Sequence, residues 1–462
     1  MRVSIAVIFV ICMIPFHALA GGGGTVPDAQ IQALMEQNRA LMEQNRNLAR
    51  RLEAVESKLA SIEQKSDKGD ARLARELEEQ SRAMADEDAW YRHITIDGGM
   101  TGVVQGSANN GDNNPEGGDQ VDAAYTFDLN LHADLGGYGN MHLHLEGGDG
   151  EGMNNNVPSF SVPNYDAYAT LNNANLADLT ISEVYYENSF FSDMLMFDIG
   201  KMDLSVLFDE NEVAGDETTQ FLSNIFVKSM GVVIPEPDEF YCPTMMFTLT
   251  PVELVEMKLI GAAVDTEHKH VWEDVFSNGF LAGQVNFRPQ IAGRQGNYRF
   301  YGWYDSRRYL DNDSISAIAD FRKADDHRSG FGLSFDQEVT DFLSMFARYS
   351  WTDDKASWNR DDSRWELLPV NQMYTLGLAL GGSLWNRPDD SLGLGFGQTI
   401  LTSDFEEMEI DTSDECYIET YYRFHFNRYL ALSADFQWIR NPGGLSDNDD
   451  AYIFGIRSQI DF

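Results

Sequence analysis

Apolar and polar side chains alternate along the chain from His93 to the C-terminus. From Tyr125 to Asp134, every second residue is Tyr, Phe, Leu or Ala, and the residues between them are Thr, Asp, Asn and His. A period of two is typical of a β-strand with one apolar and one polar face. The pattern predicts about seventeen strands, at residues 93–106, 123–133, 141–146, 179–187, 194–201, 225–234, 241–250, 254–264, 280–288, 298–304, 331–338, 342–351, 373–384, 392–400, 417–426, 429–439 and 452–462.

Short turns and long polar connections separate these predicted strands. Residues 339–341 and 427–428 are tight joins, whereas residues 147–178, 306–328 and 353–371 are long and polar. This asymmetry is typical of transmembrane barrels, whereas a soluble β-sandwich needs an apolar core between two sheets and no such asymmetry. Since only closure removes unpaired strand edges in lipid, we predict an all-β transmembrane antiparallel β-barrel with an even number of strands, sixteen or alternatively eighteen.

A different period precedes the barrel, over residues 28–88. Apolar residues recur every three to four positions, and the hexapeptide LMEQNR occurs twice, one heptad apart. This heptad pattern predicts an α-helical coiled coil before the barrel, placed in the periplasm, and polar seam residues such as Asn38 and Asn45 specify register and strand number. The seam residues expected to drive homo-oligomerisation, with a trimer favoured, are Leu34, Asn38, Leu41, Asn45, Leu48, Leu52, Val55, Leu59 and Ile62.

The first twenty residues have the pattern of an export signal. Arg2 precedes a short apolar run, and Ala18-Leu19-Ala20 matches a signal cleavage site. The run is too short to span about 30 Å of hydrocarbon. We therefore expect a signal peptide at 1–20, a flexible lead at 21–27, the coiled coil at 28–88 and an outer-membrane barrel at 89–462.

Charge is concentrated in the predicted barrel. The whole chain has a formal net charge of −41, and residues 89–462 hold 22 Lys and Arg against 60 Asp and Glu, a net −38. So acidic a domain excludes nucleic acid as a partner and favours cations or neutral polar solutes. Cys242 and Cys416 are far apart in sequence, and their spacing leaves a disulfide between them open.

The chain contains none of the common catalytic or nucleotide-binding motifs. It has no H-E-x-x-H, G-x-S-x-G, Walker A or helix-opening G-x-G-x-x-G sequence. His142 and His144 share a strand face, and we expect them to line the lumen rather than to bind a metal. The prediction is therefore a protein that is not an enzyme, with no cofactor and no metal site.

The stretch 200–222 interrupts the strand pattern. It combines many carboxylates with apolar residues such as Phe208 and Phe221, which suggests a segment packed on the barrel wall with polar groups facing water. A pore constriction needs groups that replace part of a solute's hydration, and an arginine on a lipid face would cost about 2–4 kcal/mol near the midplane. The constriction candidates are Lys201, Asp203, Asp209, Asn211, Glu212, Asp216, Glu217, Gln220 and the strand arginines Arg288, Arg299, Arg348 and Arg423.

The same stretch resembles OprB-type carbohydrate-selective porins of Gram-negative outer membranes. The resemblance lies in Gly200-Lys201, Asp203, Phe208-Asp209, Asn211-Glu212, Asp216-Glu217 and Gln220-Phe221-Leu222, and it extends more loosely from about Ile94 to Phe462. It implies a sixteen-stranded barrel that admits sugars. The terminal residues Phe454, Ile456, Ile460 and Phe462 resemble the final strand that such barrels present to the barrel assembly machinery, although Ser458 breaks the alternation.

Three functions fit these features. The first is passive, carbohydrate-selective diffusion of small sugars or other small polar solutes through the cell outer membrane. The second is a general cation-preferring porin or metal-uptake channel, motivated by the negative charge. The third is a barrel, embedded in outer-membrane lipid, that anchors a coiled-coil tether to the cell wall. The sequence leaves open which sugar or ion is selected.

Overall fold

A computed structural model describes residues 93–109, 118–171, 179–236, 240–264, 279–314, 324, 326–359, 364–409 and 411–462. The chain divides into two units, Met1–Asp88 and Ala89–Phe462, and the described residues belong to the second. The expected signal peptide, flexible lead and coiled coil lie outside the described residues. None of the helices in the described part of the chain is long and apolar enough to cross a membrane.

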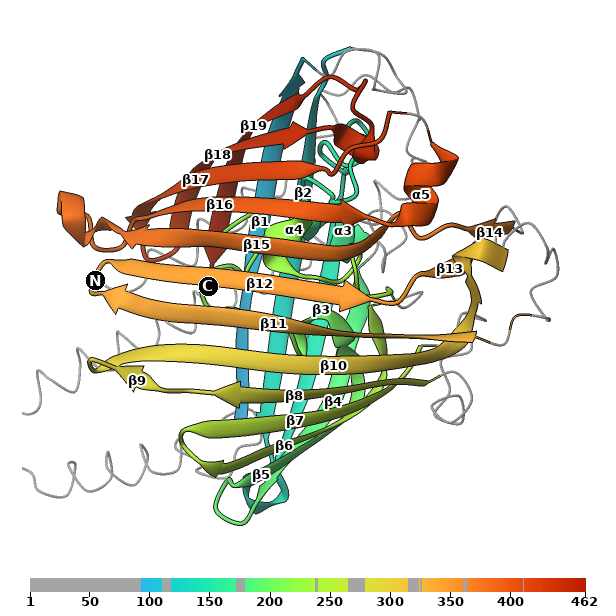
Figure 1. Cartoon of the computed structure of the whole chain (residues 1–462). Helices are drawn as coiled ribbons and strands as arrows, with labels where there is room; N and C mark the ends of the chain where they lie inside the picture. Colours follow the sequence, from blue (N-terminus) through green and yellow to red (C-terminus); the bar gives the residue numbers. More distant parts are fainter. Residues whose placement is uncertain are drawn as a thin grey trace, which may run out of the picture. The chain divides into compact units, whose positions relative to one another are not determined.

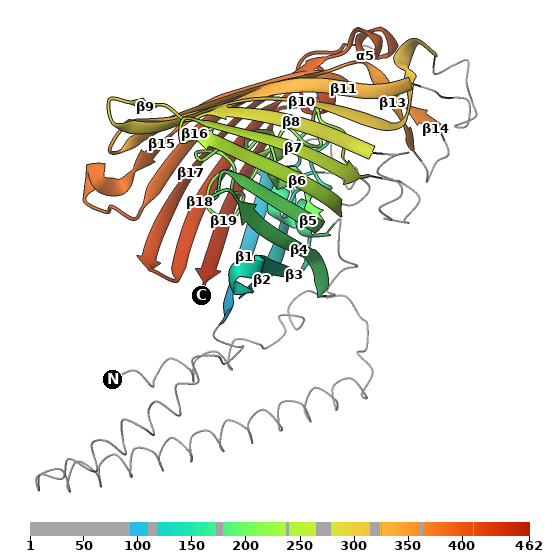
Figure 2. The same ribbon diagram turned by 90° about the horizontal axis from the view of Figure 1, so that it is seen from below.

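Sixteen antiparallel strands form a closed barrel. Each strand pairs with the next along the chain, and the last strand, β19, pairs with β1 from Gly99↔Asp461 to Ala108↔Tyr452. Figures 1 and 2 show β1 lying between β2 and β19, which closes the ring. The barrel strands are β1 (Ile94–Ala108), β2 (Val121–Asp134), β3 (Asn140–Asp149), β4 (Thr180–Phe190), β5 (Leu195–Asp203), β6 (Tyr241–Val252), β7 (Val255–Ala263), β8 (Gly279–Phe287), β10 (Arg294–Asp311), β11 (Asp326–Thr340), β12 (Leu343–Thr352), β15 (Val370–Gly381), β16 (Ser391–Leu401), β17 (Cys416–Asn427), β18 (Leu430–Arg440) and β19 (Ala451–Asp461).

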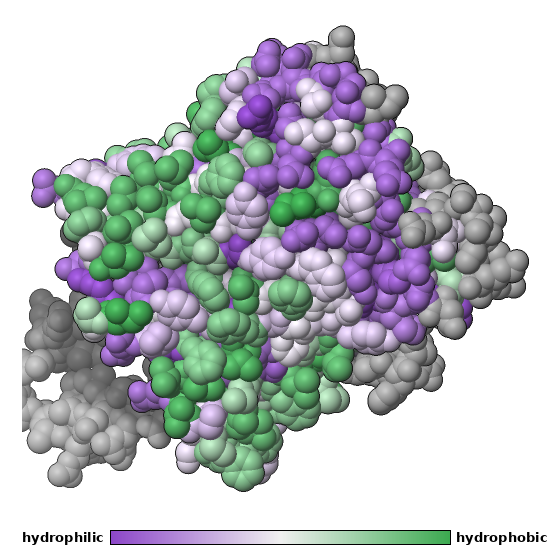
Figure 3. Space-filling model, in the orientation of Figure 1, coloured by the Kyte–Doolittle hydropathy of each residue, from purple (hydrophilic) through white to green (hydrophobic). Residues whose placement is uncertain are grey.

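The period-two pattern sorts side chains to the two faces of the barrel wall. On β19, Ile453, Arg457 and Gln459 are buried inside, whereas Phe454 and Ile456 are exposed outside. Figure 3 shows hydrophobic residues gathered over the strands and hydrophilic residues toward the end that carries β13 and β14. An apolar outer wall with a polar interior is the arrangement that a bilayer requires.

The two ends of the barrel differ, as predicted. One end carries tight joins such as residues 341–342 and 428–429 and is called the short-turn end; the other carries the long connections and is called the long-connection end. The remaining elements are the short strands β9 (Gln290–Ile291), β13 (Lys355–Asn359) and β14 (Arg364–Glu366), the helices α3 (Tyr165–Leu171), α4 (Asn224–Val227) and α5 (Ser403–Met408), and the 3₁₀ turns η4 (Gly136–Tyr138), η5 (Leu204–Val206), η7 (Asn312–Ser314), η9 (Gly382–Trp385) and η10 (Pro442–Gly444).

One predicted strand is wrong, and its removal gives the correct number. Residues 225–234 form α4 and a turn closed by an isolated bridge between Met230 and Ile234. The segment is apolar because it is buried on every side inside the barrel, so Ile225, Phe226 and Val227 are all fully buried. The other sixteen predictions match the sixteen barrel strands, and the choice of sixteen over eighteen is confirmed. Cys242 and Cys416 form no disulfide with each other in this part of the chain.

Candidate channel constriction

The connection between β5 and β6 folds into the barrel. Figures 1 and 2 show α4, which belongs to this connection, within the ring of strands. We call residues 204–236 the inward segment. It contains six of the twelve constriction candidates, and it enters the barrel rather than covering one rim (Figure 1).

Aromatic side chains attach the inward segment to the wall. Phe221 is fully buried, with ring centroids 5.5 Å from Phe346 and 5.1 Å from Tyr421. Phe208 packs in the same way, 5.5 Å from the ring of Tyr301. Burial of one such ring contributes about 1.5–3 kcal/mol. The two phenylalanines are therefore anchors of the inward segment and do not face solute.

Arg348 on β12 holds the inward segment by its backbone. Its guanidinium donates to the carbonyl oxygens of Asp209 at 3.1 Å and Ala214 at 2.7 Å, and also to that of Phe226. The Asp209 carboxylate lies 3.3 Å from Nε of Arg348 and accepts the amide N–H of Ser229 at 2.9 Å. Both charged groups are buried, so each supplies the counter-charge that the other needs.

A second ion cluster lies beside the first, around Arg299 on β10. Arg299 donates to Asp336 at 2.5 Å and lies 3.8 Å from Glu210 and 3.5 Å from Glu212. Burial raises the pKa of the Glu210 carboxyl, but Lys258, Gln284 and Arg299 together lower it by more, so the net pKa is lowered. The Glu212 side chain stays 73% exposed, which leaves its carboxylate available to solute.

Asn211, Asp216 and Gln220 mainly shape the inward segment itself. Asn211 donates to the hydroxyl of Ser334 at 3.2 Å. Its side-chain oxygen accepts the amide N–H groups of Val213 and Ala214 at 3.0 and 3.1 Å. Asp216 accepts the N–H and hydroxyl groups of the next two threonines, as a turn-capping carboxylate does. Gln220 closes the turn by accepting the amide of Gly215 at 2.8 Å.

Two buried charges at this site escaped the sequence analysis. Arg457 on β19 donates to the carbonyl oxygens of Glu217 at 2.6 Å and Gln220 at 2.7 Å. Glu419 on β17 accepts the amide N–H groups of Leu222 at 2.6 Å and of the following serine at 3.0 Å. Both residues face the barrel interior, on strands whose outward-facing residues are mostly apolar. A charged residue at an inward position of such an alternating strand is the sequence feature that could have identified them.

The remaining candidates lie away from these clusters or on their edge. Lys201 shares the strand face of Phe197 and donates to the carbonyl oxygen of Ile181 at 3.3 Å. Arg288 follows β8 at the short-turn end and pairs with Glu256 at 3.0 Å. Arg423 on β17 is only partly buried. Five candidates thus lie together in one region: Asp209, Asn211, Glu212, Arg299 and Arg348. Three more, Asp216, Glu217 and Gln220, lie together in a second region. Asp203 lines a cavity that is described below.

A cavity of about 490 Å³ lies toward the long-connection end, and we call it the arginine cavity. Its charged lining residues are Arg307, Arg308, Arg328, Glu236 and Glu366, and its apolar lining includes Phe160, Tyr309 and residues 232–235 of the inward segment.

Buried partners fix the arginines of this cavity. Arg307 donates to both carboxylate oxygens of the fully buried Asp305, at 2.6 Å for the shortest contact. Tyr309 donates to the same carboxylate at 2.9 Å, and the guanidinium of Arg328 lies 5.9 Å from the Tyr309 ring. Arg307 also donates to the backbone carbonyl of Glu236 at 2.8 Å, and Arg328 donates to that of Val233 at 3.0 Å, so both guanidinium groups have a fixed orientation.

A second cavity, of about 500 Å³, lies toward the short-turn end, and we call it the carboxylate cavity. Among the residues that the structure describes, no Lys or Arg lines it. Its eight carboxylate residues are Asp97, Asp128, Glu146, Asp166, Glu183, Asp203, Glu217 and Asp461. Burial raises the pKa of Glu217, on the inward segment, to about 7, with a smaller raising effect from Asp216.

Comparisons with known proteins agree with this architecture. Residues 254–462 match the model of the OprB family of carbohydrate-selective porins. The match begins after the stretch 200–222, so the residues that first suggested the resemblance lie outside it. Together with the closed barrel, the match indicates an outer-membrane protein.

Individual relatives are similar over part of their length. Porin B of Pseudomonas aeruginosa is 26% identical over 216 residues, which cover 39% of this chain and 45% of that protein. Porin AaxA of Chlamydia pneumoniae is 23% identical over 173 residues, which cover 36% of this chain and 37% of that protein. The chain therefore spans less than half the length of these relatives.

Among solved structures, the high-pH structure of Pseudomonas putida OprB is similar in fold. The TM-score is 0.66 at 17% sequence identity, over 80% of this chain and 94% of that one. At this identity, the similarity shows a shared fold and carries no information about the solute.

Proposed function

We propose that this protein is an outer-membrane porin through which small carbohydrates diffuse passively. The lining of the arginine cavity carries the proposal. It offers fixed guanidinium donors, carboxylate acceptors at Glu236 and Glu366, and the faces of Phe160 and Tyr309. A sugar presents hydroxyl groups around its edge and C–H groups on its faces, so a polar site with aromatic walls can replace part of its hydration. The family match over residues 254–462 supports the same class of solute.

In this proposal, the inward segment narrows the pore between the two cavities. The exposed Glu212 carboxylate, held near Arg299, is the constriction candidate best placed to contact a passing solute. Because the anchors of the segment are buried in the wall, the constriction keeps its shape as solutes pass. The long connections then lie on the extracellular side and the short turns on the periplasmic side, as in other outer-membrane barrels.

Liposome swelling with a set of sugars and amino acids of similar size tests the proposal. We expect faster swelling with sugars, and we expect millimolar sugar to reduce the ion current in planar bilayers. The variant Arg308→Gln should weaken the sugar effect, whereas Arg288→Gln, at the opposite end, should retain it. Equal swelling rates for sugars and amino acids, with no block by sugar, would leave a general porin and remove the carbohydrate selectivity.

A cation-preferring channel is the second candidate, and the carboxylate cavity favours it. Eight acidic residues around one cavity concentrate cations near the pore. A reversal potential measured across a salt gradient tests this second candidate, which predicts a preference for cations. A potential that favours anions would exclude the second candidate and leave the first intact.

Residues 28–88 enter the proposal as a periplasmic coiled coil that joins copies of the chain, with a trimer favoured, or that reaches the cell wall. The two repeats of LMEQNR support it. We further propose that the final strand, with Phe454 and Phe462, is presented to the barrel assembly machinery. Deletion of residues 28–88 tests the coiled coil: loss of the trimer on native gels supports joining, whereas weakened envelopes with unchanged conductance support tethering. If the deletion causes neither of these changes, both proposed roles are excluded.

A further inference from the structure

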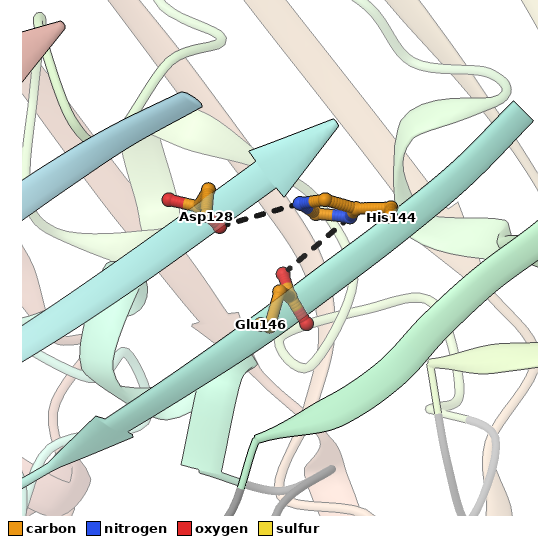
Figure 4. A group of neighbouring side chains, drawn as sticks. All are labelled: Asp128, His144 and Glu146. Atoms are coloured by element: carbon orange, nitrogen blue, oxygen red, sulfur yellow. Dashed lines mark ion pairs between the residues drawn. The ribbon is translucent and has the colours of Figure 1, made fainter. Parts of the chain in front are cut away.

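Three side chains in the wall of the carboxylate cavity come together on two neighbouring strands. Asp128 on β2 is the register partner of Glu146 on β3, and His144 lies two residues before Glu146, on the same face. One potential ligand atom from each residue lies within 4.8 Å of those of the other two. Figure 4 shows both carboxylates next to the imidazole ring, at 3.4 Å for Asp128 and 4.0 Å for Glu146.

Glu146 has an unused oxygen at this point. Its side chain is only 8% exposed, and Oε1 accepts the hydroxyl of Tyr241. Oε2 is buried and has no hydrogen-bond partner in the described part of the chain. A buried carboxylate oxygen without a donor is costly unless a cation or a proton satisfies it. The Glu146 oxygen nearest His144 is Oε1, and Oε2 belongs to the same carboxylate, so a cation that binds this carboxylate at the cluster would offset part of the cost of burying it.

The surroundings select for positive charge. The cavity that reaches His144 is lined by eight carboxylate residues, including Glu183 and Asp203. Their summed field attracts cations, and a divalent ion gains about twice as much as a monovalent one. Since the cavity opens beside the cluster, water can supply the remaining ligands of a bound ion.

We propose that Asp128, His144 and Glu146 bind a divalent transition-metal ion of the zinc class. One imidazole nitrogen and two carboxylate oxygens, completed by water, form a donor set that zinc accepts, whereas calcium and magnesium take oxygen ligands. The hydroxyl of Tyr241 orients Glu146, as outer-shell donors orient metal-binding carboxylates. The site is separate from the arginine cavity, and it stands whether or not the pore selects sugars.

A doubly protonated His144 is the competing arrangement. The two ring nitrogens face different carboxylates, Nε2 toward Asp128 and Nδ1 toward Glu146, and with both nitrogens protonated the cluster would need no metal. Zn²⁺ would then have to displace a ring proton, so this arrangement predicts only weak zinc binding at neutral pH, and a direct binding measurement separates the two.

The test is equilibrium dialysis of tag-free, full-length protein in detergent, stripped with EDTA and titrated with Zn²⁺. We expect one saturable site per chain, weakened more than about tenfold in Glu146→Gln and in His144→Asn. The matched controls are Glu366→Gln, in the arginine cavity, and His327→Asn, on β11, and both should bind zinc as the unmodified protein does.

Resistance of the folded barrel to SDS at room temperature checks each variant, and Co²⁺ absorption spectra report the nitrogen and oxygen ligands of the unmodified protein directly. The absence of a saturable site in the unmodified protein would overturn the proposal. Equal affinity in all four variants would overturn it as well, because binding would then come from other acidic groups.

Discussion

The arginine cavity and the carboxylate cavity have nearly the same volume and opposite chemistry. The first has three arginines and two carboxylate residues, and the second has eight carboxylate residues and, in the described part of the chain, no Lys or Arg. Both are partly lined by the inward segment, the first by residues 231–236 and the second by residues 205, 206, 217 and 218. A single connection thus contributes to two chemically different compartments.

This difference shows that net charge is a poor guide to the selectivity of a pore. Residues 89–462 have a net charge of −38, yet Arg307, Arg308 and Arg328 gather around one cavity near the long-connection end. A solute would meet hydrogen-bond donors and aromatic faces in one cavity and a concentrated negative field in the other. Sugar recognition is then a property of the arginine cavity and cation enrichment a property of the carboxylate cavity, so one pore can have both.

The largest effect should come from Arg348→Met, which releases the inward segment. The change leaves Asp209 buried without its counter-charge and the carbonyl oxygen of Ala214 without its donor. Breaking a buried pair on one side costs about 3–5 kcal/mol. We expect lower stability toward urea in lipid vesicles and a larger, noisier single-channel current, because the two cavities would no longer be separated.

The matched control is Arg288→Met, which removes an arginine from a partly exposed pair with Glu256. Exposed pairs contribute about 0–1 kcal/mol, so stability and current should change little. Adding Asp209→Asn to Arg348→Met should restore part of the stability, because the buried charge is then removed. An Arg348→Met barrel with unchanged current would show that the segment does not separate the cavities.

Gly395→Ala should have the next largest effect, by pushing the inward segment off the wall. A Cβ atom at this position on β16 would lie 2.7 Å from the ring of Phe226 and 3.1 Å from that of Phe221. Overpacking of this kind costs about 1–3 kcal/mol. The control is Gly283→Ala on β8, whose nearest contact would be a backbone oxygen at 3.8 Å. Equal unfolding midpoints for the two variants would contradict the tight packing at Gly395.

The barrel was predictable from the sequence because its strands repeat one simple rule. An alternating pattern fixes which residues face lipid, and sixteen of the seventeen predicted strands follow it. Residues 225–234 failed because an apolar run has no period that separates a strand from a buried turn. Inside the barrel, Phe226 is surrounded by wall residues from distant strands, and no local pattern encodes that contact.

The candidate site was predictable only in part, for a related reason. The stretch 200–222 stood out by its composition, so Glu212 and Asp209 were found. Arg457 and Glu419 were missed because each is a single charge in a strand, and their partners lie roughly two hundred residues away in sequence. The arginine cavity was missed as a unit, since β10, β11 and the inward segment meet only after the ring closes.

Charge changes in the two cavities should shift ion selectivity in opposite directions. The double variant Asp97→Asn/Asp461→Asn should lower the ratio of cation to anion permeability, and Arg308→Gln should raise it. A unit charge about 8 Å from an ion in water contributes about 0.5 kcal/mol, with opposite signs for cations and anions, so each removed charge should change the ratio by up to about fivefold. Reversal potentials at about 10 mM salt give the ratio, since the screening length is then about 30 Å. Shifts in the same direction would show that the cavities act as one electrostatic compartment.

The smallest effect should be a pH step set by Glu217. Burial raises the pKa of its carboxyl to about 7, so the group is neutral below that pH and negative above it. The folded state holds this proton between the ordinary pKa of about 4.5 and about 7, so the contribution of Glu217 to stability falls as pH rises through that window. Cation preference should rise over the same pH range, by less than about fivefold for this one charge.

Reversal potentials measured between about pH 5 and pH 9 should therefore show a step near neutrality. Glu217→Gln should reduce the step, because its side chain carries no charge at either end of the range. Glu212→Gln is the matched control on the same segment, with a carboxylate that is 73% exposed, and it should keep the step. A step of unchanged size in Glu217→Gln would assign the titration entirely to other carboxylates of the cavity and would show that the inward segment does not contribute to the negative field at the short-turn end.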